Sequence, residues 1–242
     1  MSIEINNLSS GYRRIPVIKH INAQLDPGEV VSLIGLNGAG KSTLLKTILG
    51  LIQPLEGEVL LNGISLLDDQ MSYAGSIGYI PETPILYEEL TLREHLEMVA
   101  LGYQLPLGLI MERAQPMLEK FRLADKLDWF PTHFSKGMKQ KVMIICAFVT
   151  DATIFIIDEP FLGLDPVGIQ DLMNLMRQRA KAGATILFTT HVLSMADQLA
   201  DRYLLMRSGE IVADGNLSQL QEQFKLPGAT MDEIYLKLAE VN

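Results

Sequence analysis

Features that define several protein classes are scarce in this sequence of 242 residues. Its single cysteine, Cys146, excludes a disulfide framework and a cysteine-based metal site, and is typical of a reducing compartment. Its longest uninterrupted apolar run, residues 142–149, is far shorter than the roughly 20 residues of a membrane-spanning helix. The N-terminus shows no basic stretch followed by an apolar signal segment. We therefore expect a cytoplasmic chain, which at a membrane would depend on another polypeptide for the span.

Positive charge is also in short supply. The chain has 29 acidic and 20 basic residues, which gives a net charge of -9. Proteins that bind nucleic acid usually carry a broad excess of lysine and arginine, so we expect no nucleic-acid partner, although a small basic patch remains possible. The length allows one large domain, with or without an inserted subdomain.

The most informative stretch is a glycine-rich motif that fits the pattern G-x-x-x-x-G-K-[ST]. Its residues are Gly35, Leu36, Asn37, Gly38, Ala39, Gly40, Lys41, Ser42 and Thr43. Residues 30–34 before it have the composition of a buried strand, and apolar residues recur at helical spacing after it up to Gly50, so an accidental match is disfavoured. The glycines let backbone N–H groups surround phosphates at a helix N-terminus. The motif predicts a triphosphate site where Lys41 reaches the β- and γ-phosphates and Ser42 binds Mg²⁺.

Apolar periodicity along the rest of the chain predicts an α/β fold with a mainly parallel sheet and an N-terminal antiparallel β-subdomain. The expected strands are residues 3–8, 21–25, 30–34, 57–61, 76–80, 153–157, 184–189, 203–206 and 210–213. The expected helices are residues 41–49, 91–101, 111–121, 142–149 and 166–182, followed by a polar-amphipathic tail. We predict one domain, 1–242, with a P-loop core at about 1–83 and 151–216, an α-helical subdomain at about 84–150 and a helical tail at about 217–242.

Further candidate residues lie at the ends of these expected elements. Asp158 and Glu159 follow a buried strand, at the sheet edge where ligands of parallel sheets collect, although acidic pairs are common at strand ends by chance. Ser135 is placed to cap the helix that follows it. His191 stands just past another strand, a position where a lone histidine is usually structural. Tyr12 is expected in a loop, where position alone favours covering the core edge over stacking on an adenine.

These features occur in one order that resembles the ATP-binding subunit of ABC transporters over essentially the whole chain. A phosphate loop is followed by a helical insertion, a Ser-x-Gly segment, a strand ending in Asp-Glu-Pro, then Gly-Leu-Asp and Thr-Thr-His. The resemblance implies that residues 35–43 form the Walker A loop, that Tyr12 stacks on adenine, and that Ser135, Gly137 and Met138 belong to the ATP-binding signature. It implies that Asp158 is the metal-binding Walker B aspartate and that Glu82 stands at the metal-binding position usually held by glutamine. It also implies that Glu159 is the catalytic carboxylate, Asp165 the D-loop aspartate and His191 the switch histidine.

The sequence departs from the commonest family pattern at two places. Lys136 and Met138 replace glycine and glutamine in the signature Leu-Ser-Gly-Gly-Gln, and Glu82 replaces glutamine. The segments around these positions, residues 79–82 and 135–139, are similar to those of bacterial exporter-type ATPases whose permease is a separate chain, and most similar to the Ecs-type group. The resemblance implies that two ATP-binding subunits, expected to form a homodimer, close around ATP with the catalytic residues Lys41, Glu159 and His191.

The resemblance also implies a membrane partner. A permease subunit would contact residues 82–90 and the helical subdomain, the chain would lie at the inner face of the cell membrane, and transport would run outward. The alternative is a soluble ATPase of the same superfamily that acts in assembly or repair, but no second ATPase domain, coiled coil or basic surface is present. A phosphotransferase would have no use for the signature, and a nonhydrolysing regulatory module would have no use for Glu159 and His191.

Overall fold

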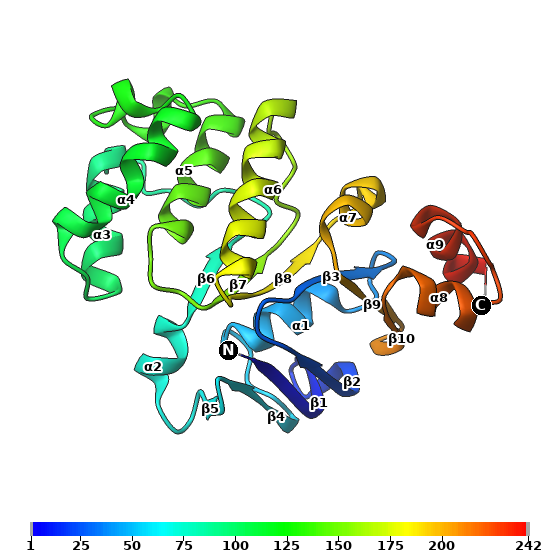
Figure 1. The fold of residues 1–242 in the computed structure, drawn as a ribbon. Coiled ribbons are helices and arrows are strands. Elements are labelled where there is room, and N and C mark those ends of the chain that lie inside the picture. The colour runs from blue at the N-terminus through cyan, green and yellow to red at the C-terminus, as the bar shows by residue number, and fades with distance from the viewer. Residues whose placement is uncertain (1, 241–242) are drawn as a thin grey trace.

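The computed structural model describes residues 2–240 and places their strands in two sheets (Figure 1). The smaller sheet is antiparallel and has the order β2-β1-β4-β5. The larger sheet has the order β10-β9-β3-β8-β7-β6, with β9 and β10 antiparallel and all other neighbours parallel. The strands are β1 (Ile3–Tyr12), β2 (Ile15–Leu25), β3 (Val30–Gly35), β4 (Glu56–Leu61), β5 (Ile64–Ser65), β6 (Ile77–Ile80), β7 (Ile154–Ile157), β8 (Thr185–Thr189), β9 (Arg202–Arg207) and β10 (Glu210–Gly215). The predicted fold class is confirmed.

Helices cover both faces of the larger sheet. The helices are α1 (Lys41–Ile48), α2 (Gln70–Gly75), α3 (Leu92–Gly102), α4 (Leu107–Lys120), α5 (Lys136–Phe148), α6 (Pro166–Lys181), α7 (Leu193–Leu199), α8 (Leu217–Gln223) and α9 (Met231–Glu240), with 3-10 turns at Ala124–Lys126 and Pro131–His133. In Figure 1, α3 to α6 lie on one side of this sheet, and α1 and the antiparallel sheet lie on the other. No helix within residues 2–240 has the length and apolar character needed to cross a membrane.

The central strands separate two hydrophobic cores. Every residue of β7 and β8 is buried, as expected for parallel strands that are covered on both faces. Because side chains alternate along a strand, Phe155 and Ile157 enter the core under the helices, whereas Ile154 and Ile156 enter the core above the antiparallel sheet. The carboxyl ends of the strands are thereby held at one rigid edge.

Local capping signals identified helix starts correctly. Thr91 and Glu94 form the predicted capping box at α3. The Ser135 side chain accepts a hydrogen bond from the Met138 backbone N–H at α5, and Asp165 caps α6 ahead of its N1 proline. The helical pattern in residues 84–150 was also correct in kind, because α3, α4 and α5 lie there, but α4 and α5 both start earlier than expected.

The expectation for Tyr12 was wrong. Tyr12 is the last residue of β1 and is 48% exposed, so it lies neither in a loop nor at the core.

The tail forms two helices, as expected for an amphipathic helical tail, and Leu220, Ile234 and Leu238 bury their side chains in the main core. Cys146 is half-buried, and burial raises the pKa of its thiol to about 12, which keeps the thiol protonated and unreactive.

Candidate functional site

Residues 35–43, the phosphate loop, connect β3 to α1 as predicted. Gly40 has a φ of 106°, a conformation that favours glycine, and turns the chain into α1. A Cβ on Gly35 would lie 2.5 Å from the Met206 carbonyl oxygen, so the loop packs directly on β9. α1 begins with no side-chain cap and no acidic residue in its first turn. Its first N–H groups therefore have no acceptor inside the helix and face outward at its positive end, which suits an anion.

Lys41 places its ammonium against this loop. Its Nζ donates hydrogen bonds to the carbonyl oxygens of Gly35 at 2.6 Å and Leu36 at 3.3 Å. Burial lowers the pKa of Lys41, and the nearby carboxylates of Glu159 and Asp158 oppose that shift. The Lys41 side chain therefore bonds the loop carbonyls and lies near the carboxylates of Glu159 and Asp158.

The predicted strand-end residues meet the phosphate loop in one cavity of about 460 Å³. Its lining consists of Val17, Leu36, Asn37, Gly38, Ala39, Gly40, Lys41, Ser42, Thr43, Glu82, Asp158, Glu159 and His191. Glu82 follows β6, the acidic pair follows β7 and His191 follows β8, so parallel neighbours deliver all four side chains to the same edge. Sequence reasoning missed Val17, whose position in β2 gives no separate signal.

Glu159 has an uncommon backbone conformation, and hydrogen bonds with neighbouring polar groups hold it in place. Its φ is 47°, in the left-handed region that non-glycine residues rarely adopt. Its backbone N–H donates to Thr189 Oγ1 at 3.0 Å, and the Thr189 hydroxyl donates to Asp158 Oδ1 at 2.5 Å. The His191 backbone N–H donates to Glu159 Oε2 at 3.1 Å. These bonds orient the two carboxylates independently of any ligand.

The second carboxylate oxygen of Glu159 is available for chemistry. Glu159 Oε1 is buried and makes no hydrogen bond within residues 2–240, although His191 Nε2 lies 3.3 Å away. Burial raises the pKa of Glu159, while His191 and Lys41 act in the opposite direction and Asp158 adds to the increase. A carboxylate with a raised pKa and an oxygen that accepts no hydrogen bond inside a cavity has the properties of a general base.

The remaining predicted binding residues lie outside this cavity. Ser135 is exposed at the start of α5, and Gly137 approaches residue 163 so closely that a Cβ would lie 2.4 Å from the Gly163 carbonyl oxygen. Met138 follows in the same turn, and Asp165 is paired with Lys141 instead of with the phosphate loop. Tyr12 does not line the cavity either. Within one chain, the structure brings together the Walker-type residues but not the signature residues 135–139.

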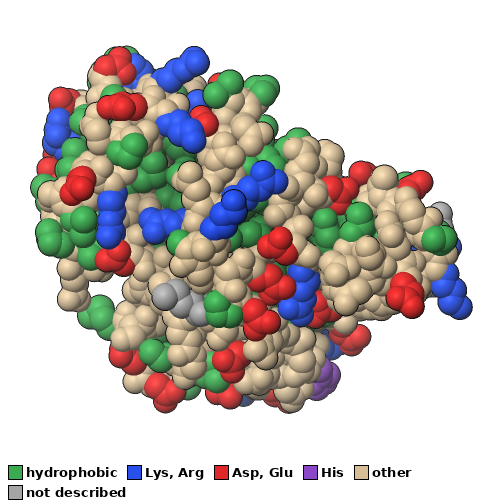
Figure 2. Space-filling view, viewed as in Figure 1, with side chains coloured by type: hydrophobic (Ala, Val, Ile, Leu, Met, Phe, Trp, Pro, Cys, Tyr) green, Lys and Arg blue, Asp and Glu red, His purple; other side chains and the backbone are tan. Residues whose placement is uncertain are grey.

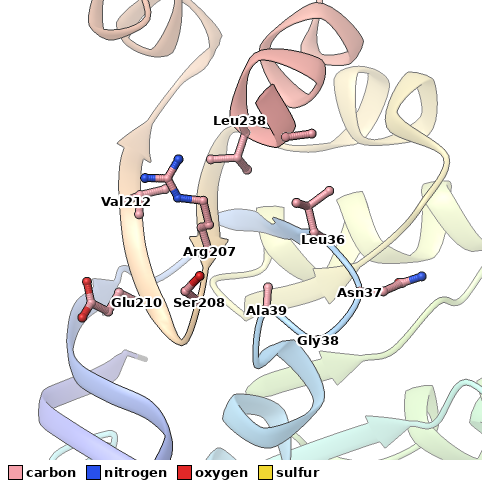
Figure 3. Close-up of a pocket in the computed structure, with 10 residues that line it drawn as sticks. Leu36, Asn37, Gly38, Ala39, Arg207, Ser208, Glu210, Val212 and Leu238 are labelled. Carbon is pink, nitrogen blue, oxygen red and sulfur yellow. The ribbon is translucent and has the colours of Figure 1, made fainter. Parts of the chain in front are cut away.

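A second cavity of about 610 Å³ lies on the other side of the phosphate loop (Figure 3). It is walled by the loop, by the β9–β10 hairpin and by α9, with Leu36, Arg207 and Leu238 projecting toward it. The Gly209 N–H donates to the Ala39 carbonyl at 3.0 Å, so the hairpin supports the loop directly. The sequence predicted this hairpin but gave no sign that it would lie beside the loop.

The protein oxygens in this cavity can bind Mg²⁺ only together with phosphate oxygens of a ligand. No three His, Cys, Asp or Glu side chains in the described part of the chain gather closely enough to hold a metal by themselves. The Ser42 hydroxyl and the Asp158 carboxylate share one cavity with the phosphate loop, and Glu82 is exposed on its lining. Mg²⁺ is commonly bound by one or two protein oxygens plus substrate phosphates, so these residues fit the ion.

Comparison with known proteins agrees with this geometry. Residues 18–162 match the family model described as ABC transporter. The chain is 48% identical over 238 residues to the ABC-type transporter ATP-binding protein EcsA of Bacillus subtilis, which covers 98% of this chain and 96% of that protein. A solved ATP-binding subunit of an ABC transporter is 46% identical, with a TM-score of 0.96 and coverage of 99% of this chain and 100% of that one.

A more distant solved structure is a dimeric ATP-binding cassette in a post-hydrolysis state with ADP and Pi bound. It is 27% identical, with a TM-score of 0.79, and the alignment covers 89% of this chain and 98% of that one.

Proposed function

The chain belongs to the ABC transporter family of ATP-binding subunits, and from this premise we propose that two copies close around ATP and that hydrolysis drives a separate membrane permease. ATPase activity itself follows from membership of the family. The proposal concerns which residues carry out the hydrolysis, how the two copies pair and what they drive.

The observation that carries the proposal is the buried Oε1 of Glu159 in the cavity of the phosphate loop, which accepts no hydrogen bond within residues 2–240 and faces His191 Nε2 at 3.3 Å. We assign Glu159 as the base that accepts a proton from the attacking water, and His191 as the group that orients Glu159 and contacts the γ-phosphate. Lys41 would bind the β- and γ-phosphates. Ser42 and Asp158, with Glu82 as a third candidate, would hold Mg²⁺, which supplies positive charge against the phosphate oxygens when bound.

Pairing of two copies would complete the site. Asn37 and Gly38 are exposed on the loop, so one face of a bound triphosphate would remain open to solvent. The signature residues 135–139 sit at an exposed helix N-terminus outside the cavity of their own chain. A partner's signature would supply N–H groups to that open face, and the dimeric relative with ADP and Pi supports this arrangement. Asp165 lies near the same signature and would join this interface, whereas Tyr12 would stack on adenine only from its exposed strand end.

A membrane partner would cover exposed apolar side chains next to Glu82. Ile85 and Tyr87 are exposed in the segment after β6, and Leu101 and Trp129 are exposed on the helical insertion. Figure 2 shows hydrophobic side chains along the edge where α3 lies. Export is the direction we propose, because residues 79–82 and 135–139 resemble exporter-type ATPases. The location we propose is the cytoplasmic face of the membrane.

The test is affinity purification of the tagged chain from membranes of its source organism, with identification of the captured membrane protein. A double variant, Ile85→Ser with Tyr87→Ser, should lose that protein while keeping ATPase activity. Leu67→Ser is the matched control, because Leu67 is 86% exposed but lies before α2 and outside residues 82–90. An active ATPase that captures no membrane-spanning protein in any form would favour the soluble alternative.

A further inference from the structure

His95 is a buried polar side chain in α3 that the ATP site does not use. It is 2% exposed, and Leu92 and Leu96 beside it on the helix lie in the main apolar core. It does not line the phosphate-loop cavity. Burial of an imidazole among apolar side chains costs free energy unless its ring nitrogens have hydrogen-bond partners. The partners of His95 therefore indicate what the residue is there to hold.

Both ring nitrogens of His95 are bonded to the backbone. Nδ1 lies 2.7 Å from the Thr91 carbonyl oxygen, and Nε2 lies 3.0 Å from the Tyr87 backbone nitrogen. A carbonyl can only accept and an N–H can only donate, so Nδ1 carries the proton and Nε2 is the acceptor. The Thr91 carbonyl also accepts a hydrogen bond from the His95 backbone N–H at 3.0 Å. Only the bond to Tyr87 therefore depends on the imidazole.

The bond to Tyr87 is the polar anchor of the segment that follows β6. Residues 82–90 form neither a helix nor a strand. In the part of the chain that the structure describes, His95 is the only group outside this segment that bonds to residues 82–89, and the Leu90 N–H donates back to the Tyr87 carbonyl at 3.1 Å. Without the imidazole acceptor, residues 82–89 would have no hydrogen bond to the rest of the described protein.

The same bond fixes which side chains of the segment face outward. Leu86 packs against the main core, whereas Ile85 is 72% exposed and Tyr87 is 58% exposed. Neighbouring side chains of an extended stretch point to opposite sides, so a buried Leu86 turns its two neighbours outward. Fixing the Tyr87 backbone beside His95 keeps this orientation, because rotation of the segment would break the hydrogen bond.

α3 gives this anchor a fixed base. The Leu92 backbone N–H donates to the Trp129 carbonyl at 3.0 Å, and the Arg93 N–H donates to the Leu127 carbonyl at 2.8 Å. These bonds hold the exposed Trp129 at the start of α3, one turn from His95. Two exposed apolar parts of the surface, one in residues 85–87 and one at Trp129, are therefore attached to the same helix end.

We propose that His95 is a positioning residue for the membrane partner, because it fixes the backbone on which Ile85 and Tyr87 are presented. This inference rests on the proposed function, in which residues 82–90 contact a permease. The surface formed by Ile85, Tyr87 and Trp129 is apolar, so it fits an apolar segment of the permease. His95 is buried and does not touch that segment, and it acts on the contact only through Tyr87.

The test removes the acceptor and then restores it. His95→Phe keeps a ring of similar size but cannot accept from the Tyr87 N–H, whereas the side-chain amide oxygen in His95→Gln can. Hydrogen exchange of residues 83–90, measured by mass spectrometry on the full chain, should become about tenfold faster in His95→Phe. It should stay near the parent's rate in His95→Gln. A role in packing alone would change both variants alike.

The second measurement uses the membrane protein that the tagged parent captures from membranes of its source organism. The amount captured should fall by about 3- to 10-fold in His95→Phe, the fold-change that corresponds to loss of one hydrogen bond. In His95→Gln it should return to within about 2-fold of the parent. ATPase activity should stay within about 2-fold in both variants, because His95 lies outside the phosphate-loop cavity.

Tyr103→Phe is the matched control. Tyr103 follows the other end of α3, and its hydroxyl donates to the Ile77 carbonyl oxygen at 2.5 Å. The variant therefore also removes one hydrogen bond from a side chain to the backbone of another element, but outside residues 82–90. Both the exchange rate of residues 83–90 and the captured amount should match those of the parent.

Three results would overturn the positioning role of His95. They are unchanged capture by His95→Phe, equal losses of capture in His95→Phe and His95→Gln, and equal losses in His95→Phe and Tyr103→Phe. A parent that captures no membrane protein would instead overturn the proposed function, and the positioning role with it. Hydrogen exchange needs no partner, so it shows separately whether His95 holds residues 83–90 in place.

Discussion

Two helix N-termini in this molecule, those of α1 and α5, differ in whether a side chain already bonds their first N–H groups. α1 starts after a left-handed glycine, carries no side-chain cap and opens into a cavity lined by Lys41 and three carboxylates. α5 starts at the exposed Ser135, whose side chain already accepts a hydrogen bond from the Met138 N–H of its own helix, and its first residues do not line the phosphate-loop cavity. The first places the phosphate loop, Lys41 and the candidate base together within one chain, whereas the second lies apart from these groups.

The difference explains how one chain could both bind ATP alone and require a second copy to hydrolyse it. An uncapped N-terminus leaves its donors for the ligand, so binding there needs no rearrangement. A capped N-terminus is stable without a ligand and can remain exposed until a partner arrives. If this account is correct, substitutions at α1 and α5 should separate ATP binding from dimer formation.

Glu159→Gln should have the largest effect. It keeps the shape and the hydrogen bond from His191 but removes the base, so steady-state hydrolysis should fall by about 10²–10⁴. ATP binding at α1 should persist, and an ATP-bound dimer should accumulate, measurable by light scattering. A monomer at every ATP concentration, in this variant and in the parent, would contradict the shared site in the isolated subunit.

Lys41→Ala tests the α1 site directly. Loss of an ammonium that bonds charged phosphate oxygens should weaken ATP binding by at least about 30-fold, measured by calorimetry. Lys46→Ala is the matched control, because Lys46 is an exposed lysine in the last turn of the same helix. Near-normal affinity in Lys41→Ala would refute the phosphate-loop assignment.

The position of the phosphate loop was predictable because its signals are local. A strand composition, a glycine pattern and a helical period occur within residues 30–50, so no distant contact was needed to recognise them. The position of Asp158 and Glu159 beside the loop was also predictable, since parallel strands share one carboxyl edge, whereas His191 was assigned to the site only by the family resemblance.

The wrong or missing expectations depend on contacts distant in sequence. α2 and α7 were missing because they are too short to show a helical period. Tyr12 was misplaced because β1 continues up to the hairpin turn, where Tyr12 pairs with Ile15 of β2, and side-chain alternation does not reveal this backbone pairing. The Lys141–Asp165 pair joins helices whose packing no local pattern specifies.

The pH dependence of hydrolysis should reflect the environment of Glu159. Because burial raises its pKa, the base is protonated at a higher pH than an ordinary glutamate, and the rate is lost as pH falls through that raised value. Below it, the rate should drop about tenfold per pH unit. ATP binding measured over the same pH range provides the control, since ATP affinity should not fall along with the rate. If the rate instead falls around the ordinary pKa of glutamate, burial is not the dominant influence on the pKa of Glu159.

Ser135→Ala should have a smaller effect that is confined to α5. Loss of the cap costs about 1 kcal/mol of stability, and loss of a hydroxyl at the proposed interface should weaken ATP-driven dimer formation by several-fold. Thr91→Ala removes a comparable cap from α3 and serves as the control. ATP affinity of the monomer should stay unchanged in both. If both variants weaken the dimer equally, Ser135 acts only through stability.

The smallest expected effect concerns Glu82, where glutamine is usual in the family. Glu82 lines the cavity of the phosphate loop but is exposed, so it can face the metal or a membrane partner. A carboxylate is a stronger ligand for Mg²⁺ than an amide oxygen, yet it repels the γ-phosphate when the metal is absent. Glu82→Gln should therefore preserve hydrolysis at saturating Mg²⁺ and flatten its dependence on the metal by a few-fold. Superimposable Mg²⁺ titrations of the variant and the parent would instead assign Glu82 to solvent or to the permease surface.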